Sequence, residues 1–232
     1  MASRSTLATI AGEVAEALLP QRCIVCDRFG AALHDGCVEA LVAAPPPRCD
    51  ICWAPIHWRD ELCERCATSG PAFDGLRAAF RFVGDARRAL IEAKFRGVTR
   101  LIEPLAHAAA LSVPLHWDID VVVLIPLNGT RERRRGYNQA EIAARVVAGD
   151  LGVPLERSLL RRATATEPQA MLSAERRASN LSGAFSVDAP PQPGVLLVDD
   201  ITTTGATFEE AAGTLRRAGA ASVYALALAR ED

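Results

Sequence analysis

Two groups of residues near the start of the chain have the types and spacing of metal ligands, and all seven cysteines lie between Cys23 and Cys66. Two cysteines separated by two residues point both sulfur atoms at one ion, and two such pairs complete a tetrahedron around zinc. The second group has this pattern in full and consists of Cys49, Cys52, Cys63 and Cys66. In the first group a histidine replaces the fourth thiolate, and the members are Cys23, Cys26, His34 and Cys37. Neither set leaves a position for water, so we expect two structural Zn²⁺ ions.

Two alternatives stay open in this region. His34 could be a surface histidine in a ribbon that holds no metal. Aromatic and arginine residues lie between the cysteine pairs, and they are Arg48, Trp53, Trp58, Arg59 and Arg65. Such residues could stack on the bases of single-stranded nucleic acid. They could equally cap a small module that has almost no core, and we favour that interpretation.

A second chemical signal is the segment 195–207, in which an apolar stretch is followed by two carboxylates, a run of threonines and a glycine. Its backbone N–H groups from 203 to 207 would lie at the start of a helix, where anions bind. The carboxylates repel phosphate, so their partners would be sugar hydroxyls or Mg²⁺. The segment therefore predicts a site for a phosphosugar that carries a metal-chelating group. The candidate binding residues are Asp199, Asp200, Thr202, Thr203, Thr204, Gly205, Ala206 and Thr207.

This segment closely resembles the phosphoribosyl-pyrophosphate (PRPP) motif of type I phosphoribosyltransferases. Other stretches resemble signatures of the ComF (competence protein F, or GntX-like) family, namely residues 94–97, 125–127, 131–139 and 169–185. They occur in the order of that family, whose architecture is an N-terminal zinc ribbon joined to a phosphoribosyltransferase-like domain. The resemblance spans about residues 23–230.

The resemblance implies specific roles for residues of this chain. In the superfamily the paired acids, here Asp199 and Asp200, hold the ribose hydroxyls of PRPP, and the following loop holds its 5′-phosphate. Guanidinium groups suit phosphate oxygens, so Arg133 and Arg135 could bind the pyrophosphate, with Arg133 a catalytic candidate beside the two acids. The alternative is that these arginines belong to a solvated basic face. Residues 163–173 would form the loop that closes over the site. We place little weight on Lys94, whose charge could reach the pocket or that loop.

The implied activity is transfer of the phosphoribosyl group from Mg²⁺-bound PRPP to an unidentified nitrogen nucleophile, a reaction of nucleotide metabolism. Purine-salvage members often carry an aspartate where this chain has Thr203, so a general base is not evident. Two alternatives remain. One is a competence factor that handles single-stranded DNA or a DNA-uptake or helicase partner, and the other is a PRPP sensor without turnover.

The elements that must position these residues alternate between strand and helix. Strands are predicted at 76–83, 120–125, 159–162, 195–198 and 222–229. Helices are predicted at 85–95, 101–111, 138–151, 173–181 and 206–218, with Asn138 as an N-cap. This alternation indicates a mostly parallel sheet, in which the strand at 120–125 should end beside that at 195–198. The fold class expected is α/β, with a type I phosphoribosyltransferase-like sheet flanked by helices and a small N-terminal zinc-ribbon module.

Composition sets the remaining limits. The chain has 232 residues, 50% of them hydrophobic, a net charge of −2 and a mean hydropathy of +0.11, so no global basic field draws it to nucleic acid or membrane. No apolar run is long enough for a membrane span, and Glu13 and Glu16 interrupt the apolar rhythm of the N-terminus, so we expect a cytoplasmic protein. The predicted division is an amphipathic helix at 1–22, a double zinc ribbon at 23–67 and a phosphoribosyltransferase-like domain at 73–232.

Overall fold

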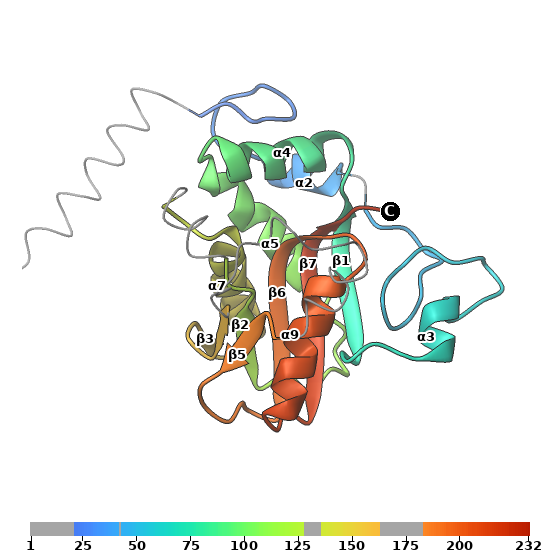
Figure 1. Ribbon diagram of the computed structural model, residues 1–232. Coiled ribbons are helices and arrows are strands. Elements are labelled where there is room, and N and C mark those ends of the chain that lie inside the picture. Colours follow the sequence, from blue (N-terminus) through green and yellow to red (C-terminus); the bar gives the residue numbers. More distant parts are fainter. Residues whose placement is uncertain (1–20, 42, 128–135, 163–182) are drawn as a thin grey trace, which may run out of the picture.

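The computed structural model describes residues 21–41, 43–127, 136–162 and 183–232, and within them the chain forms a five-stranded parallel sheet in the order β1-β7-β6-β2-β3 (Figure 1). Its strands are β1 (Gly75–Arg81), β2 (Val121–Leu124), β3 (Leu155–Glu156), β6 (Gly194–Thr202) and β7 (Ser222–Arg230). A separate antiparallel pair is formed by β4 (Leu160–Arg162) and β5 (Phe185–Val187). The α/β class and the parallel sheet predicted from the sequence are confirmed.

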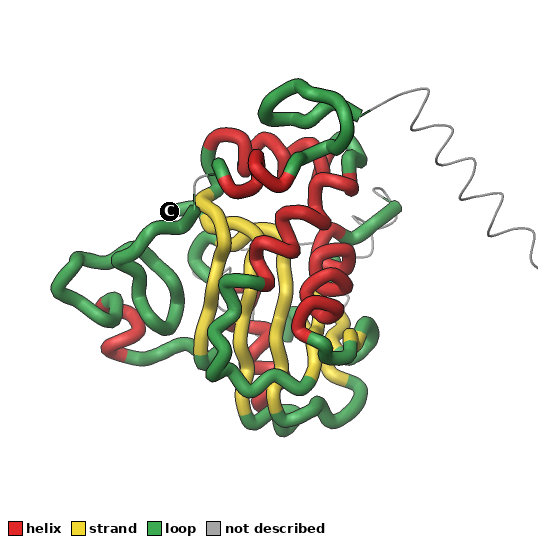
Figure 2. The backbone as a smooth tube through the Cα atoms, turned by 180° about the vertical axis from the view of Figure 1, so that it is seen from behind, coloured by secondary structure: helices red, strands yellow, loops and turns green. Residues whose placement is uncertain are grey.

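Helices cover both faces of the sheet, as Figures 1 and 2 show from opposite sides. One face carries α9 (Ala206–Arg217), and the other carries α4 (Gly84–Phe95), α5 (Ile102–Ala110) and α7 (Gln139–Leu151), with η1 (Thr99–Leu101) leading into α5. Side chains of β6 alternate between the two cores. Leu196 and Val198 pack with the α4, α5 and α7 side, while Val195 and Leu197 pack with the α9 side. All four are fully buried, which explains the continuous apolar run.

The two cysteine groups pack on different faces of the sheet. The first group contributes Cys23 to the core shared with α4 and α5, together with Val38 of the short helix α2 (Asp35–Glu39). The second group contributes Cys49 and Cys66 to the core shared with α9, and it includes the short helix α3 (Glu64–Thr68). Figure 1 shows the second group beside β1 and the first beyond α4, so each ribbon is attached to the body separately.

Several predicted boundaries shift in the structure. The strand predicted at 195–198 continues to Thr202 as β6, because Asp199, Ile201 and Thr202 pair with β7. The short strands β3 and β5 were not predicted, since neither is long enough to show a period. The helices predicted at 1–22 and 173–181 and the closing loop at 163–173 lie outside, or almost wholly outside, the described residues. In the part of the chain that is described, no helix has the length and apolar character to cross a membrane.

Candidate functional site

The candidate site lies where β6 extends beyond the end of its neighbour β2. Leu124 of β2 is paired with Val198, and the N–H of Ile125 donates to the Val198 carbonyl at 2.9 Å. Beyond this point the chain leaves β2 through Pro126, while β6 continues beside β7 as far as Thr202. Within the described ranges no strand pairs with this edge of β6 after Val198. The carboxyl end of a parallel strand next to a departing neighbour is where open α/β sheets bind ligands.

Asp200 is held in the site by a lysine from another element. Its carboxylate oxygen lies 3.3 Å from Nζ of Lys94, which belongs to the last turn of α4. The Asp200 side chain is 10% exposed and that of Lys94 is 26% exposed, so this ion pair is shielded from solvent. The sequence gives only a weak indication that Lys94 belongs to the site, and the structure places Lys94 against one of the two predicted acids. The spacing along the chain could not show this, because the contact joins α4 to β6.

The electrostatic surroundings of Asp199 disfavour its charged form. Burial raises the pKa of Asp199 well above its ordinary value, and the negative charge of Asp200 acts in the same direction. The positive charge of Lys94 and the Asp200 N–H, which donates to Asp199 Oδ1 at 2.8 Å, lower that pKa but less strongly. A carboxylate whose charged form is disfavoured beside a second acid is stabilised by a cation or by hydrogen-bond donors, which a divalent cation or sugar hydroxyls would supply.

The threonine-rich turn has the backbone form expected for an anion site. Gly205 is the N-cap of α9 with a φ of +80°, in the left-handed region that favours glycine. Thr203 and Thr204 are exposed, and Thr204 Oγ1 accepts a 3.4 Å hydrogen bond from the Ala206 N–H. Thr202 is buried at the end of β6. The N–H groups that open α9 therefore lie beyond the acidic pair at the same edge of the sheet.

The start of α7 is tied to the same edge. The hydroxyl of Tyr137 donates to the Ala93 carbonyl at 2.6 Å, next to Lys94. The Asn138 side chain donates to the Ile125 carbonyl at 3.3 Å, and its oxygen accepts from the Ala140 N–H at 3.0 Å. The predicted N-cap is confirmed. The predicted phosphate-binding residues Arg133 and Arg135 lie outside the described residues.

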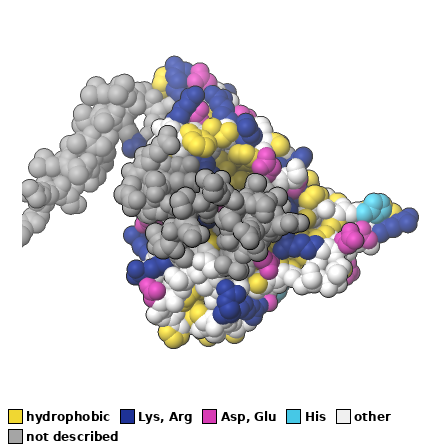
Figure 3. Space-filling view, in the orientation of Figure 1, with side chains coloured by type: hydrophobic (Ala, Val, Ile, Leu, Met, Phe, Trp, Pro, Cys, Tyr) yellow, Lys and Arg dark blue, Asp and Glu magenta, His cyan; other side chains and the backbone are white. Residues whose placement is uncertain are grey.

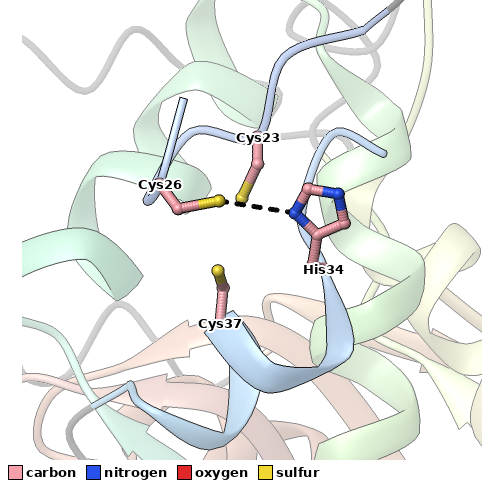
Figure 4. A group of neighbouring side chains, drawn as sticks. All are labelled: Cys23, Cys26, His34 and Cys37. Atoms are coloured by element: carbon pink, nitrogen blue, oxygen red, sulfur yellow. Dashed lines mark hydrogen bonds between the residues drawn. The ribbon is translucent and has the colours of Figure 1, made fainter. Parts of the chain in front are cut away.

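Both predicted ligand groups converge in the structure. In each group the four ligand atoms lie within 4.8 Å of one another. Figure 4 shows the first group, in which Cys26 Sγ lies 3.5 Å from His34 Nδ1. His34 Nε2 lies 3.2 Å from the Phe29 carbonyl, which can only accept, so Nε2 carries the hydrogen and the Nδ1 lone pair faces the sulfur atoms. Three thiolates and one imidazole suit zinc, as do the four thiolates of the second group. His57 belongs to neither cluster.

Most arginine and aromatic residues between the cysteine pairs have structural contacts. Arg48 forms a buried ion pair with Asp232 at 2.7 Å. Trp53 Nε1 donates to the Ala78 carbonyl at 3.1 Å. Trp58 is 69% exposed, and the Arg59 guanidinium lies 4.6 Å from its ring centroid. Arg48 and Trp53 therefore connect this module to the C-terminus and to β1, and neither side chain is free to stack on bases.

Comparison with curated proteins finds relatives of nearly the full length. The chain is 30% identical to DNA utilization protein YhgH of Salmonella typhi over 91% of this chain and 98% of that protein. It is 27% identical to Competence protein F of Haemophilus influenzae over 85% of this chain and 90% of that protein. No family model matches the chain.

Similar solved structures include the glutamine PRPP amidotransferase of B. subtilis (23% identical, TM-score 0.38, covering 53% of this chain and 25% of that chain). Another is the purine phosphoribosyltransferase of Pyrococcus horikoshii (17% identical, TM-score 0.34, covering 54% and 69%). The fold class follows from the strand order and register of this chain rather than from these scores.

The strand order, the turn from β6 into α9 and the two cysteine-rich clusters define an α/β protein with a parallel sheet and two candidate metal sites near its N-terminus. Similarity to a curated protein over 91% of this chain identifies its family. The chain belongs to the competence protein F (ComF) family.

The two clusters predict the metal content of the purified protein. We expect two zinc ions per chain, because each cluster offers a complete tetrahedral set. Cys37→Ser and Cys66→Ser should each lower the content to about one ion per chain. His57→Ala is the control and should leave it unchanged. Elemental analysis of the dialysed protein measures this, and an unchanged zinc content in Cys37→Ser would contradict a metal role for the first cluster.

The raised pKa of Asp199 predicts how stability depends on pH. Between the ordinary aspartate pKa of 3.8 and the higher folded value, the native state binds more protons than the unfolded state, so the free energy of unfolding falls as pH rises through this range. Asp199→Asn removes this penalty and should be more stable than wild type at pH 7, with the difference shrinking toward pH 4. Urea unfolding across that range measures this. The control is Asp60→Asn at an exposed position, and parallel pH profiles for Asp199→Asn and wild type would contradict the assignment.

Proposed function

We propose that this protein binds the Mg²⁺ complex of PRPP at the edge of β6 that extends beyond β2. The observation that supports this most directly is that two carboxylates and the N-terminus of a helix follow one another along this edge of β6. Asp199 and Asp200 lie in the part of β6 that pairs with β7 but extends beyond β2, and α9 begins after Gly205 with first-turn N–H groups that have no helix partner. Carboxylates suit the ribose hydroxyls and the magnesium, and a helix N-terminus suits the 5′-phosphate.

In this proposal the chain binds the sugar of the ligand through acidic acceptors and its phosphates through hydrogen-bond donors and arginines. Asp200 accepts hydrogen bonds from ribose hydroxyls, and the ion pair with Lys94 holds its carboxylate in place when the sugar is absent. The N–H groups of 203–207 bind the phosphate, with the exposed hydroxyls of Thr203 and Thr204 as further donors. Arg133 and Arg135 are proposed to meet the pyrophosphate. Magnesium bound with PRPP would neutralise charge on the pyrophosphate as it leaves.

The site would support transfer of the phosphoribosyl group to a nitrogen nucleophile. In that reaction the bond from ribose C1 to the pyrophosphate oxygen breaks, a bond from C1 to nitrogen forms, and the nitrogen releases a proton. The segment 199–207 contains no base besides the two acids. We therefore propose that stabilisation of the leaving pyrophosphate drives the transfer, and that the proton passes to solvent.

Calorimetric titration of Mg²⁺–PRPP tests the site. We expect saturable binding by wild type and a loss of about 100-fold in affinity in Asp200→Asn, because two charge-assisted hydrogen bonds are removed. Asp188→Asn is the matched control, since Asp188 is 55% exposed and pairs with Arg161 away from the site. Release of pyrophosphate in the presence of a nitrogen nucleophile distinguishes transfer from sensing. If the folded wild type does not bind Mg²⁺–PRPP, both phosphoribosyl transfer and PRPP sensing are excluded.

A second candidate function is contact with single-stranded DNA, and we propose that the exposed Trp58–Arg59 pair of the second ribbon makes it. An exposed indole stacked with a guanidinium suits the faces of unpaired bases. The names of the relatives, Competence protein F and DNA utilization protein, agree with this. Figure 3 shows that lysine and arginine side chains form separate groups on this face rather than one continuous basic field. Stacking is therefore a better basis for binding than charge alone.

Fluorescence anisotropy with a labelled oligothymidylate tests this contact. Trp58→Ala should weaken binding about tenfold, because stacking of one base is worth about 1–3 kcal/mol. Leu115→Ala removes an apolar side chain elsewhere that is more exposed than Trp58, and this variant should bind like wild type. Asp200→Asn should also keep DNA binding, which separates this surface from the PRPP site. Equal affinity of Trp58→Ala and wild type would contradict the proposal.

A further inference from the structure

We infer that the second metal cluster supports the phosphate-binding turn and that Arg65 is the positioning residue that connects them. This inference rests on the proposed function, because it assigns a role to Arg65 in the same PRPP site. Arg65 lies between Cys63 and Cys66, two of the four ligands of the second cluster. Its side chain leaves the ribbon and reaches the turn between β6 and α9.

Two contacts link Arg65 to that turn. Its Nη1 donates to the carbonyl oxygen of Thr204 at 3.1 Å, and its Nη2 lies 3.0 Å from a carboxylate oxygen of Glu209 in α9. The other carboxylate oxygen of Glu209 accepts a hydrogen bond from the Ala72 N–H at 2.9 Å. One guanidinium thus holds the turn and the first part of α9 together, with the chain segment that leaves the ribbon bound to the same carboxylate.

The bond to the Thr204 carbonyl controls the direction of a phosphate donor. A trans peptide is planar, and its carbonyl and N–H point in opposite directions. Fixing the Thr204 carbonyl toward Arg65 therefore points the Gly205 N–H away from the ribbon. Gly205 has a φ of +80° and can turn readily, since its peptide is not restrained by a side chain. An external donor on the Thr204 carbonyl removes this freedom and preorganises the turn for an anion.

The metal cluster explains how Arg65 is itself fixed in place. The helix α3 has only 5 residues, too few to be stable alone. A metal ion bound by Cys63 and Cys66 would anchor this helix at both sides of Arg65. The ribbon is also bound to the sheet, because the Leu76 N–H donates to the Ile51 carbonyl at 2.6 Å and Arg230 donates to the Cys52 carbonyl at 3.1 Å.

The first cluster offers a natural comparison. Arg22 is next to Cys23 just as Arg65 is next to Cys66, and it also forms an ion pair at 3.0 Å. Its partner is Asp27 of the same ribbon, so this pair connects the first cluster to nothing beyond itself. The ion pair of Arg65 with Glu209 is partly exposed and would by itself contribute little. The contact with the Thr204 carbonyl is what distinguishes Arg65.

The test combines binding of Mg²⁺–PRPP by calorimetry with amide hydrogen exchange of the free protein, using Arg65→Ala, Arg65→Lys and the matched control Arg22→Ala. We expect Arg65→Ala to weaken binding about tenfold, the loss of one charge-assisted hydrogen bond, and to speed exchange of the amides at 203–207 without ligand. Arg65→Lys should recover part of both effects, because an ammonium can donate to only one of the two partners at full strength. Arg22→Ala should match wild type in both measurements, and zinc content and thermal unfolding verify that each variant is folded and metal-loaded.

The outcomes separate this inference from the proposed function. Wild-type binding and exchange in Arg65→Ala would overturn the role of Arg65 and leave PRPP binding intact. If the wild type does not bind PRPP, the proposed function fails, and the exchange of amides 203–207 still decides whether Arg65 supports the turn. An equal loss in Arg22→Ala would overturn the inference, because it would show a general effect of loosening either ribbon.

Discussion

The unequal pairing of β6 with its two neighbours is the constraint on which the candidate site depends. β6 is paired on both sides as far as Val198 and on one side only as far as Thr202. Up to Val198 every side chain is buried, and the strand is part of the core. Beyond it, one edge of the backbone is left without a strand among the described residues. Because β6 is longer than β2, the acids, the threonines and the start of α9 all lie beyond the end of β2.

This arrangement concentrates negative charge at a poorly solvated place. Burial and the neighbouring charge of Asp200 both oppose ionisation of Asp199 and raise its pKa. Lys94 opposes this effect, and Tyr137 fixes the end of the helix that carries Lys94. A site that keeps two carboxylates without enough positive charge is unfavourable for stability when empty and favourable for a cationic or hydroxyl-rich ligand. The placement of two carboxylates beside each other is therefore better explained by a ligand-binding role than by a contribution to the stability of the core.

The sequence predicted the features that depend on local spacing and missed those that depend on distant contacts. The ligand sets of both clusters, the turn of 203–207 and the Asn138 cap all lie in short segments whose residue types specify their geometry. The Lys94–Asp200 pair joins elements far apart in the chain, and no residue spacing encodes it. The extension of β6 to Thr202 depends in the same way on β7, because polar residues with a paired partner strand do not end a strand as they would in isolation. The attachment of the two ribbons to opposite cores is also a tertiary property.

The position of the second ribbon is best explained by the edge that it covers. β1 is the edge strand of the parallel sheet, and an exposed row of N–H and carbonyl groups on such a strand promotes pairing between molecules. The segment that joins the two cysteine groups contacts this edge where the Ala44 N–H donates to the Ala79 carbonyl at 3.1 Å, and the second group contacts it where the Leu76 N–H donates to the Ile51 carbonyl. At the opposite edge β3 has only 2 residues, so little backbone is open there. Leu76 of β1 lies 3.7 Å from the position of a Cβ on Gly205, so β1 and the β6–α9 turn are neighbours. A cluster beside β1 can therefore cover the edge of the sheet and also contact that turn. Protection of the sheet edge and contact with the β6–α9 turn then depend on the same fold of one cysteine-rich segment.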